Sequence, residues 1–498
     1  MPLSPAPLLP GTSPIPAPGA RPPDLRALRL GALVAVPMLI ITLLAGNFLL
    51  PRMLFLAPGF QAQAGGGDAG ATGGGFQGFV YSWSRQDSQT YQSQNLQGGY
   101  TTPASSANMQ FEAQNFHMNA VIIPVIADMP ERNNSPLYWH VSDGANVDTL
   151  ADSDYEKAIT DAQKAGLTPI LQLEVHQFDT AGDDGPGYVG SLWAGVAGNQ
   201  ALGYGSIYDL EHTWFNTYTD FAVHFAQLSA KHKLPYFIIG DDLASMSYDT
   251  DQTSAKNDTQ GIDIPPGESR SCLGRRDCEW RHVVYAIQHA SYQSLVTKKA
   301  GHTSETGGNY SGKLIYTASW AAAPADSSSN ATTPEFEGIT WWNALSYIGV
   351  DAGFPLLAKQ IVPDVHTLEQ AWQGQGTGLA GEGNIYNRLE KVADTYSRPL
   401  IFTSAGYLSL AGGNNPTNDL TGAAISQDEQ LNDMEALVMT FKGTPWFAGV
   451  FWNGDIPFTP REQQPNWSSN SSWAGNTLAS SKESGKWLAS YWQTIPAP

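Results

Sequence analysis

The sequence predicts an α/β protein whose main part is a (β/α)₈ TIM barrel, preceded by one N-terminal transmembrane helix. Three observations predict the barrel. Short apolar runs alternate with amphipathic stretches from residue 77 onward, the apolar runs number eight, and carboxylates follow the fourth run directly. An open doubly wound sheet is the alternative, but no G-x-G-x-x-G follows the first run and no phosphate-binding loop is present.

The eight apolar runs are short and uninterrupted, as expected for strands buried on both faces of a parallel sheet. They are Gly78 to Tyr81, Ala120 to Val125, Thr168 to Leu173, Tyr236 to Ile239, Leu314 to Ala318, Tyr347 to Val350, Leu400 to Thr403 and Gly449 to Trp452. Amphipathic stretches between or after them predict helices. These are Asp152 to Ala165, His212 to Lys231, Glu279 to Lys299, Ile385 to Tyr396, Ser426 to Phe441 and Ser481 to about Tyr491.

The region before the barrel divides into three parts. Residues 1–29 form a tail rich in proline and alanine with three arginines, and residues 58–75 form a glycine-rich linker. Residues 30–57 between them contain an uncharged apolar segment, Leu30 to Leu50, of roughly the 20 residues that cross a bilayer. Because basic residues flanking a membrane helix stay on the cytoplasmic side, the tail is expected in the cytoplasm. The barrel, residues 76–498, is then expected on the extracytoplasmic side of the cell membrane. A cleaved signal peptide is the alternative for the apolar segment.

Composition limits the partners. The chain has a net charge of -20 with 26 basic residues, and no basic run is interleaved with aromatic residues, so nucleic acid is not expected as a partner. The two cysteines, Cys272 and Cys278, have the spacing of a small disulfide-closed loop outside the cytosol. Ten histidines lack metal-ligand spacing, so neither a metal nor a cofactor is expected.

The stretch L-P-Y-F-I-I-G-D-D-L-A-S-M, residues 234–246, places Asp241 and Asp242 directly after the fourth strand. The C-terminal ends of barrel strands carry the chemistry of this fold, which makes both aspartates candidate site residues. The alternative is that one aspartate caps the next turn while the other is solvated.

Other acids and aromatic residues also fall at strand ends. Glu174, Asp351 and Asp455 predict an acidic barrel mouth, although Asp351 and Asp455 also suit loop turns. Three tryptophans end strands one, five and eight, where their faces are suited to stack on sugar rings, and core packing is the alternative for each. They are Trp83, Trp320 and Trp452.

Six ordered segments resemble a known family. They begin at Thr213, Trp280, Leu314, Trp341, Pro399 and Trp446, and the first of them contains the I-G-D-D-L motif. These segments are similar to glycoside hydrolase family 113, a β-mannanase family of the large retaining (β/α)₈ clan. The resemblance spans residues 76–455 and implies the same barrel and a carbohydrate-binding cleft.

The resemblance also assigns roles, which this sequence fills with other residue types. Asp242 stands where the family has its glutamate acid/base, and Ser404 stands where the family has its nucleophilic glutamate. Tyr407 matches the tyrosine of the nucleophile motif and is expected to contact substrate. The family's lysine-proline-histidine run after strand three is replaced here by Gln172 to Glu174, and a tyrosine near the end of strand six is Gly353.

These departures leave three functions open. A hydroxyl at Ser404 cannot attack an anomeric carbon as a carboxylate does, so the first is a barrel that binds a β-glycan, mannan-type by analogy, without retaining hydrolysis. The second is an active glycosidase with relocated carboxylates, in which Asp242 is the acid and Glu174 or Asp455 the base. The third is a non-catalytic structural or interaction domain of the cell envelope.

Overall fold

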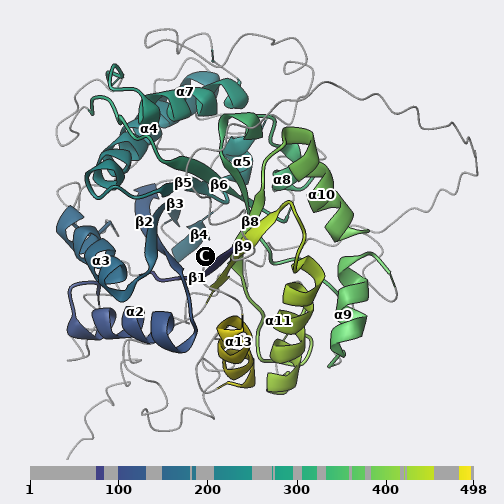
Figure 1. Cartoon of the computed structure of the whole chain (residues 1–498). Helices are drawn as coiled ribbons and strands as arrows, with labels where there is room; N and C mark the ends of the chain where they lie inside the picture. Colours follow the sequence, from purple (N-terminus) through teal and green to yellow (C-terminus); the bar gives the residue numbers. More distant parts are fainter. Residues whose placement is uncertain are drawn as a thin grey trace, which may run out of the picture.

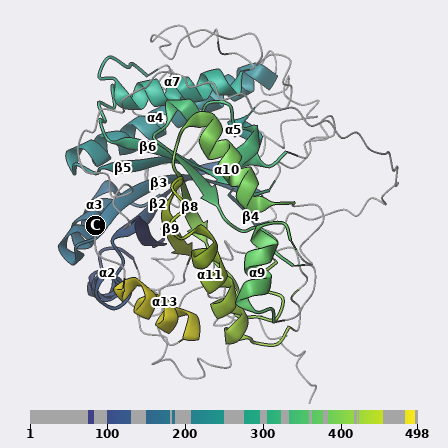
Figure 2. The ribbon, with the colours of Figure 1, turned by 45° about the vertical axis from the view of Figure 1, so that its right-hand side comes forward.

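A computed structural model describes residues 75–82, 99–129, 149–179, 182–186, 207–248, 272, 275–294, 305–321, 333–357, 362–375, 383–415, 420, 423–453 and 482–494. Eight parallel strands close into a barrel, because β2 pairs with β3 as well as with β1. Helices surround the barrel, as Figures 1 and 2 show from two directions. The prediction of a (β/α)₈ barrel is therefore confirmed.

The barrel strands follow the chain in order around the barrel. They are β1 (Phe76–Val80), β2 (Ala120–Met129), β3 (Thr168–Asp179), β5 (Tyr236–Asp241), β6 (Lys313–Ser319), β7 (Tyr347–Asp351), β8 (Leu400–Ala405) and β9 (Phe447–Asn453). A ninth strand, β4 (Gly182–Pro186), is antiparallel to the end of β3. The fourth strand of the barrel is thus β5 and the seventh is β8.

The helices of the outer layer begin and end at recognisable signals. The longer ones are α2 (Pro103–Asn115), α3 (Asp152–Ala165), α4 (Ile207–Lys231), α7 (Arg276–Gln288), α9 (Val365–Trp372), α10 (Ile385–Tyr396), α11 (Gln427–Phe441) and α13 (Glu483–Gln493), and α5 (Ala244–Ser247) and α8 (Glu335–Gly338) are single turns. The side chains of Thr102, Asp364, Asn384 and Ser426 cap four of these helices by accepting from backbone N–H groups.

Near the N-terminal ends of the strands, side chains fill the barrel interior in layers. Phe76, Tyr236, Tyr347 and Phe451 surround the strand beginnings, with ring centroids of Phe76 and Tyr236 4.9 Å apart. A layer of isoleucines from β2, β3, β5, β6 and β8 lies in the same inner cluster. We refer to this end, at the strand N-termini, as the floor.

Above the isoleucines the interior becomes polar. Thr317 of β6 donates a hydrogen bond to Thr403 Oγ1 of β8, 2.9 Å away, across the intervening strand β7. The residue of β7 at this level is Gly349, and a Cβ there would lie 3.1 Å from Thr403 Cγ2 and 2.6 Å from a backbone oxygen. Glycine is therefore required for the two threonines to meet.

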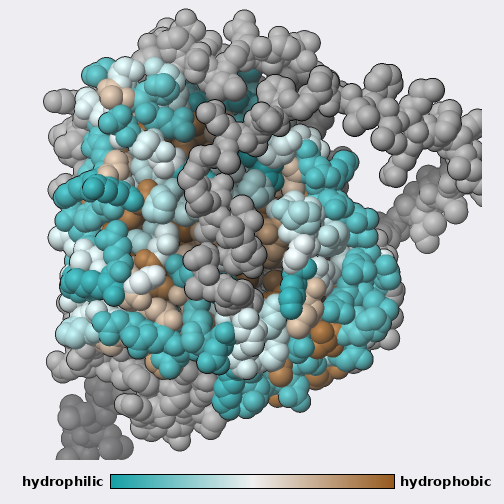
Figure 3. Space-filling model, in the orientation of Figure 1, coloured by the Kyte–Doolittle hydropathy of each residue, from teal (hydrophilic) through white to brown (hydrophobic). Residues whose placement is uncertain are grey.

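The outer core lies between the barrel and its helices and is rich in aromatic residues. Trp280 of α7 stacks on Trp341 with ring centroids 4.9 Å apart, and both indole nitrogens donate to backbone carbonyls of the α5 turn. Figure 3 shows that the outer helices present mainly hydrophilic residues to solvent. Most of the stretches between strands are therefore amphipathic, as their sequence pattern indicates, and α2 is an exception.

Some elements differ from the expectations. Helix α7 ends at Gln288 rather than near Lys299, because the chain turns at His289 and Gln293 then bridges Thr306. Helices α2 and α9 and strand β4 were not predicted; α2 buries Ser105 and Glu112 beside Met109, so it lacks a clean apolar face. No helix among the described residues is long and apolar enough to cross a membrane. The predicted anchor, residues 30–57, lies outside the described residues.

Candidate functional site

The C-terminal ends of the barrel strands form the candidate site, which we call the mouth. Alternation along each strand shows which side chains face the barrel axis, because the inner cluster contains Ile122, Ile170, Ile315 and Tyr347. Counting two residues at a time from these positions places acids of β2, β3 and β7 on the inner side. They are Asp128, Glu174 and Asp351, each 6% exposed or less.

Strand β3 contributes three polar side chains in a row. Gln172 Nε2 donates to Glu174 Oε1 at 3.1 Å, and His176 Nε2 lies 3.4 Å from Glu174 Oε2. Glu174 has no exposed surface, whereas the His176 side chain is 13% exposed. The buried carboxylate is therefore linked to the solvent side of the mouth through the imidazole.

Strand β5 ends at Asp241, and Asp242 follows it directly. Asp241 pairs in register with Thr317, which faces inward, so the two residues lie at the same level of the mouth. Asp242 has a φ of 50°, a left-handed conformation that aspartate tolerates better than most residues, and its N–H donates to the Thr317 carbonyl. Strained backbone of this kind is typical of functional sites.

A hydrogen-bonded chain supports this turn from behind. The Leu243 N–H donates to Tyr316 Oη, and Tyr316 Oη donates to Glu335 Oε1 at 2.6 Å. The other oxygen of Glu335 accepts from the Ser319 N–H. Glu335 is fully buried, so these contacts fix the ends of β5 and β6 relative to each other.

Ser404 is the last residue but one of β8, which lies three strands round the barrel from β5. A β-bulge in β8 brings Ser404 into register with Asp351 of β7. Asn453 Nδ2 of β9 donates to Ser404 Oγ at 2.5 Å. The positions that the resemblance assigns to acid/base and nucleophile thus lie at the ends of the fourth and seventh barrel strands, occupied by Asp242 and Ser404.

Trp320 occupies the place that a side chain at position 353 would fill. A Cβ on Gly353 would lie 2.7 Å from Trp320 Nε1, and the indole also packs against Phe354 with ring centroids 6.2 Å apart. Trp320 is partly exposed at the end of β6. The missing tyrosine at residue 353 is therefore matched by an aromatic ring from the neighbouring strand.

Two predicted binding residues lie in the core instead. Trp452 is 1% exposed, and its neighbours in the sheet, Phe79 and Ala405, belong to the core between barrel and helices. Tyr407 is 2% exposed and lies near Asp433 of α11; burial, with a smaller effect of Asp433, raises the pKa of its hydroxyl well above the usual value. The structure thus corrects the expectation that both face the cleft. Trp452 alternates with the inward-facing Phe451 and points outward, and Tyr407, which follows the end of β8, is buried in the core between barrel and helices.

Of the other predicted residues, two lie outside the described part of the chain and two form a disulfide. Trp83 and Asp455 lie outside the described residues. Cys272 and Cys278 are joined in a disulfide near the start of α7. Within the described residues, no group of three or more histidine, cysteine or acidic side chains could hold a metal ion.

Sequence reasoning missed three residues of the mouth. Asp128 and His176 lie in register on β2 and β3, and Asn453 contacts Ser404. All three lie beyond the apolar runs used to identify the strands. Extending each run by its period of two would have found them.

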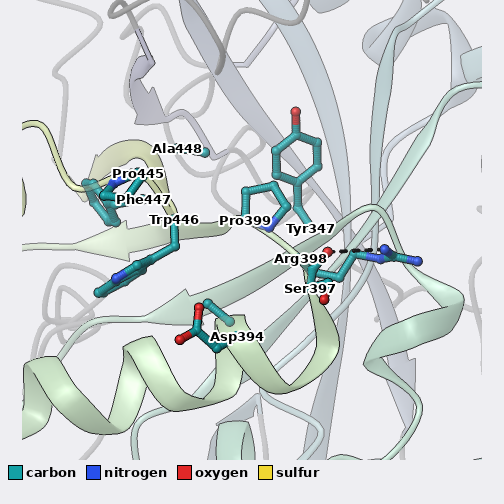
Figure 4. Close-up of a pocket in the computed structure, with 10 residues that line it drawn as sticks. Tyr347, Asp394, Ser397, Arg398, Pro399, Pro445, Trp446, Phe447 and Ala448 are labelled. Carbon is teal, nitrogen blue, oxygen red and sulfur yellow. Dashed lines mark hydrogen bonds between the residues drawn. The ribbon is translucent and has the colours of Figure 1, made fainter. Parts of the chain in front are cut away.

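A pocket of about 420 Å³ lies at the floor, the opposite end of the barrel. Figure 4 shows its lining residues, which come from the end of α10 and the beginnings of β7, β8 and β9. Trp446 donates through Nε1 to Glu390, and the Arg398 guanidinium donates to the carbonyls of Leu345, Asn343 and Ser397. Its polar groups are thus largely engaged in holding the floor together.

Comparison with known proteins agrees with this architecture. Residues 309–464 match the model of Glycoside Hydrolase Family 113. No curated protein sequence matches the chain. The solved structure of a GH113 β-mannanase from Alicyclobacillus acidocaldarius is 16% identical with a TM-score of 0.54, over 86% of this chain and all of the other. A second GH113 β-1,4-mannanase is 14% identical with a TM-score of 0.52, over 84% and 99% of the two chains. The chain therefore resembles Glycoside Hydrolase Family 113, both in the sequence of residues 309–464 and in its fold.

Proposed function

We propose that the barrel binds a β-glycan at its mouth, mannan-type by analogy, without the retaining hydrolysis of the family it resembles. The observation that carries this proposal is the hydrogen bond between Asn453 Nδ2 and Ser404 Oγ at the end of the seventh barrel strand. A retaining glycosidase needs a carboxylate at this place, about 5 Å from the acid/base.

The surroundings of Ser404 do not turn its hydroxyl into a nucleophile. A serine becomes nucleophilic when an adjacent base removes its proton. Among the described residues, Ser404 Oγ accepts a hydrogen bond from the side-chain amide of Asn453, which takes no proton. The features suited to binding remain, since Trp320 is partly exposed beside a mouth rich in hydrogen-bonding groups.

A second candidate is an inverting glycosidase with relocated carboxylates. Inversion needs an acid and a base roughly 6.5–9.5 Å apart with a water between them. Glu174 lies on β3, and Asp242 directly follows β5, the strand that pairs with β3, which favours this pair as base and acid. The Glu174–His176 contact is suited to a proton relay toward solvent.

The proposal includes a location. The barrel stands on the extracytoplasmic side of the cell membrane, held by a transmembrane helix at residues 30–57 and the linker at 58–75. The disulfide Cys272–Cys278 supports an oxidising compartment. A non-catalytic structural domain of the envelope remains the third candidate, and glycan binding separates it from the first two.

Affinity electrophoresis and sugar release test these functions together. The full chain is run through gels containing mannan or other β-glycans, and reducing sugar is measured in parallel. We expect retardation without sugar release. Sugar release that Asp242→Asn abolishes would establish the second candidate, and the absence of both signals across a broad glycan panel would leave the third.

A further inference from the structure

We infer that the floor of the barrel docks on an anionic bilayer surface, so that the mouth faces away from the membrane. The inference rests on the location given in the proposed function, an anchor at residues 30–57 joined to the barrel by residues 58–75. It adds the surface of the barrel that contacts lipid and the class of lipid that this surface prefers.

The first observation is that the chain enters the barrel at the floor. Strand β1 begins at Phe76, whose ring lies in the floor layer, and a Cβ on Gly75 would lie 2.4 Å from the carbonyl oxygen of Ala448. Ala448 also lines the floor pocket (Figure 4). A glycine-rich chain of the length of residues 58–75 has a root-mean-square span of roughly 25 Å. The tether therefore attaches at the floor, which is the end of the barrel nearest to the proposed anchor.

The second observation is the charge of the floor. The described segments that lead into β3, β5, β8 and β9 are residues 162–167, 228–235, 393–399 and 438–446. Their exposed charged residues are four lysines and one acid, namely Lys164, Lys231, Lys233, Lys442 and Asp394. The whole chain has 46 acidic and 26 basic residues, so the local excess of lysine runs against the composition.

Three of these lysines have no acidic partner among the described residues. Lys231 pairs with Glu156, but no ion pair joins Lys164, Lys233 or Lys442 to a described acid. Lysines near helix C-termini also complement the helix dipole, which explains why they gather at this end, but a full positive charge exceeds the half negative charge of one helix end. The floor therefore keeps positive charge that an anionic partner would match.

The third observation is that aromatic rings accompany the lysines. The Lys442 ammonium lies 5.3 Å from the ring centroid of Tyr491 on α13, and Tyr491 stacks on Trp487 with ring centroids 5.1 Å apart. Both rings are partly exposed. Phe111 of α2 is 39% exposed and contacts Phe116, in the segment that leads into β2. Tryptophan, tyrosine and lysine are the residues that lie at the headgroup level of a bilayer, so this combination favours a lipid surface over a soluble anion.

The test combines flotation with lysine labelling. The full chain is reconstituted with vesicles of phosphatidylcholine, either alone or with about 30% phosphatidylglycerol, and acylation of each lysine is followed by mass spectrometry. We expect Lys164, Lys233 and Lys442 to react several-fold more slowly with the anionic vesicles, since each lysine near an anionic surface strengthens association about fivefold. Lys486, in the first turn of α13 toward the mouth and with a side chain 57% exposed, should react equally with both. Added salt should remove the difference.

Matched variants locate the effect. The double variant Lys233→Gln, Lys442→Gln should restore the reaction rate of Lys164 with anionic vesicles to its rate with neutral ones. Lys486→Gln, which makes the same chemical change away from the floor, should leave Lys164 protected. Thermal unfolding of both variants checks that they fold.

The outcomes separate the inference from the proposed function. Flotation with both kinds of vesicle but equal lysine rates would overturn the inference and leave the anchor. Flotation with anionic vesicles alone would support the inference and overturn the anchor, and flotation with neither would overturn both. Soluble polyphosphate that protects the lysines as well as vesicles do would overturn the choice of a lipid surface. Glycan retention is measured without lipid, so it tests the binding function independently.

Discussion

The mouth and the floor of the barrel are built from the same eight strands but from opposite chemistry. At the floor, aromatic rings meet edge to face, as Phe76 and Tyr236 do with an interplanar angle of 77°. At the mouth, the same inward-facing rows end in acids, amides and hydroxyls such as Glu174, Ser404 and Asn453. This difference indicates that the floor stabilises the fold, whereas residues at the mouth can be substituted without loss of the barrel.

The largest effect is expected from removing a floor aromatic. Phe451→Ala should destabilise the barrel by about 3–5 kcal/mol, because a large ring leaves a cavity in a rigid layer. Phe451→Leu, which keeps much of the volume, should cost far less. Chemical denaturation followed by tryptophan fluorescence measures both. Equal small losses for both variants would show that the floor is not tightly packed.

A change at the mouth should affect binding as well as stability. Gly353→Tyr should displace Trp320, since even a Cβ at that position would lie 2.7 Å from Trp320 Nε1. We expect a loss of about 1–3 kcal/mol of stability from overpacking, together with weaker glycan retention. The double variant Gly353→Tyr, Trp320→Ala should recover stability. If the double variant is no more stable than Gly353→Tyr alone, the conclusion that Trp320 fills the space beside residue 353 would be contradicted.

The boundary between floor and mouth can be probed with Thr317 and Thr403. Thr317→Val leaves the Thr403 hydroxyl buried without its donor and should cost about 1–3 kcal/mol. Replacing both threonines with valine should cost less than the single change, because no polar group is then left unsatisfied. Denaturation of the three variants in a double-mutant cycle gives the coupling, and strict additivity would exclude a net contribution from the hydrogen bond.

The smallest and most local effect concerns pH on the outer helix α4. Burial raises the pKa of Asp220 to about 7, although Ser294 and Tyr292 donate hydrogen bonds to it. Burial lowers the pKa of His224, but hydrogen bonds with Asp152 and Glu305 outweigh this and raise it to about 9. Both groups favour the protonated form in the folded state.

The sign of the pH effect follows from these two shifts. The contribution of Asp220 is complete below its ordinary pKa of 3.8 and is lost as pH rises through about 7. The contribution of His224 is complete below 6.5 and is lost as pH rises through about 9. Amide exchange at Ser294 and Gly307, corrected for its intrinsic rate, should therefore lose protection as pH rises, while floor amides do not. Rising protection would contradict the assignment.

The sequence predicts the barrel well because its signals are local. Seven of the eight barrel strands contain the whole predicted apolar run, and β1 contains all of its run except Tyr81. Helices α3 and α10 have the predicted bounds, since Gly166 and Ser397 end them in left-handed conformations. Helix α2 was not predicted, because it buries the polar residues Ser105 and Glu112 and so lacks an amphipathic pattern. Propensity and periodicity do not anticipate such buried polar contacts.

The mouth was predicted only in part, because side-chain direction at a strand end depends on bulges and neighbours. Four predicted residues lie in the C-terminal parts of the barrel strands, as expected: Glu174, Asp241, Asp351 and Ser404. Trp452 instead points into the core between barrel and helices. The contact between Asn453 and Ser404 joins different strands and leaves no pattern in the sequence.

The most direct test of the central claim follows the anomeric protons of a bound β-glycan by NMR in the presence of the full chain. The account predicts that the glycan signals broaden on binding while no new reducing end appears. New reducing ends that first form with retained anomeric configuration, and that vanish in Ser404→Ala, would contradict it, because a retaining reaction would then proceed through a hydroxyl.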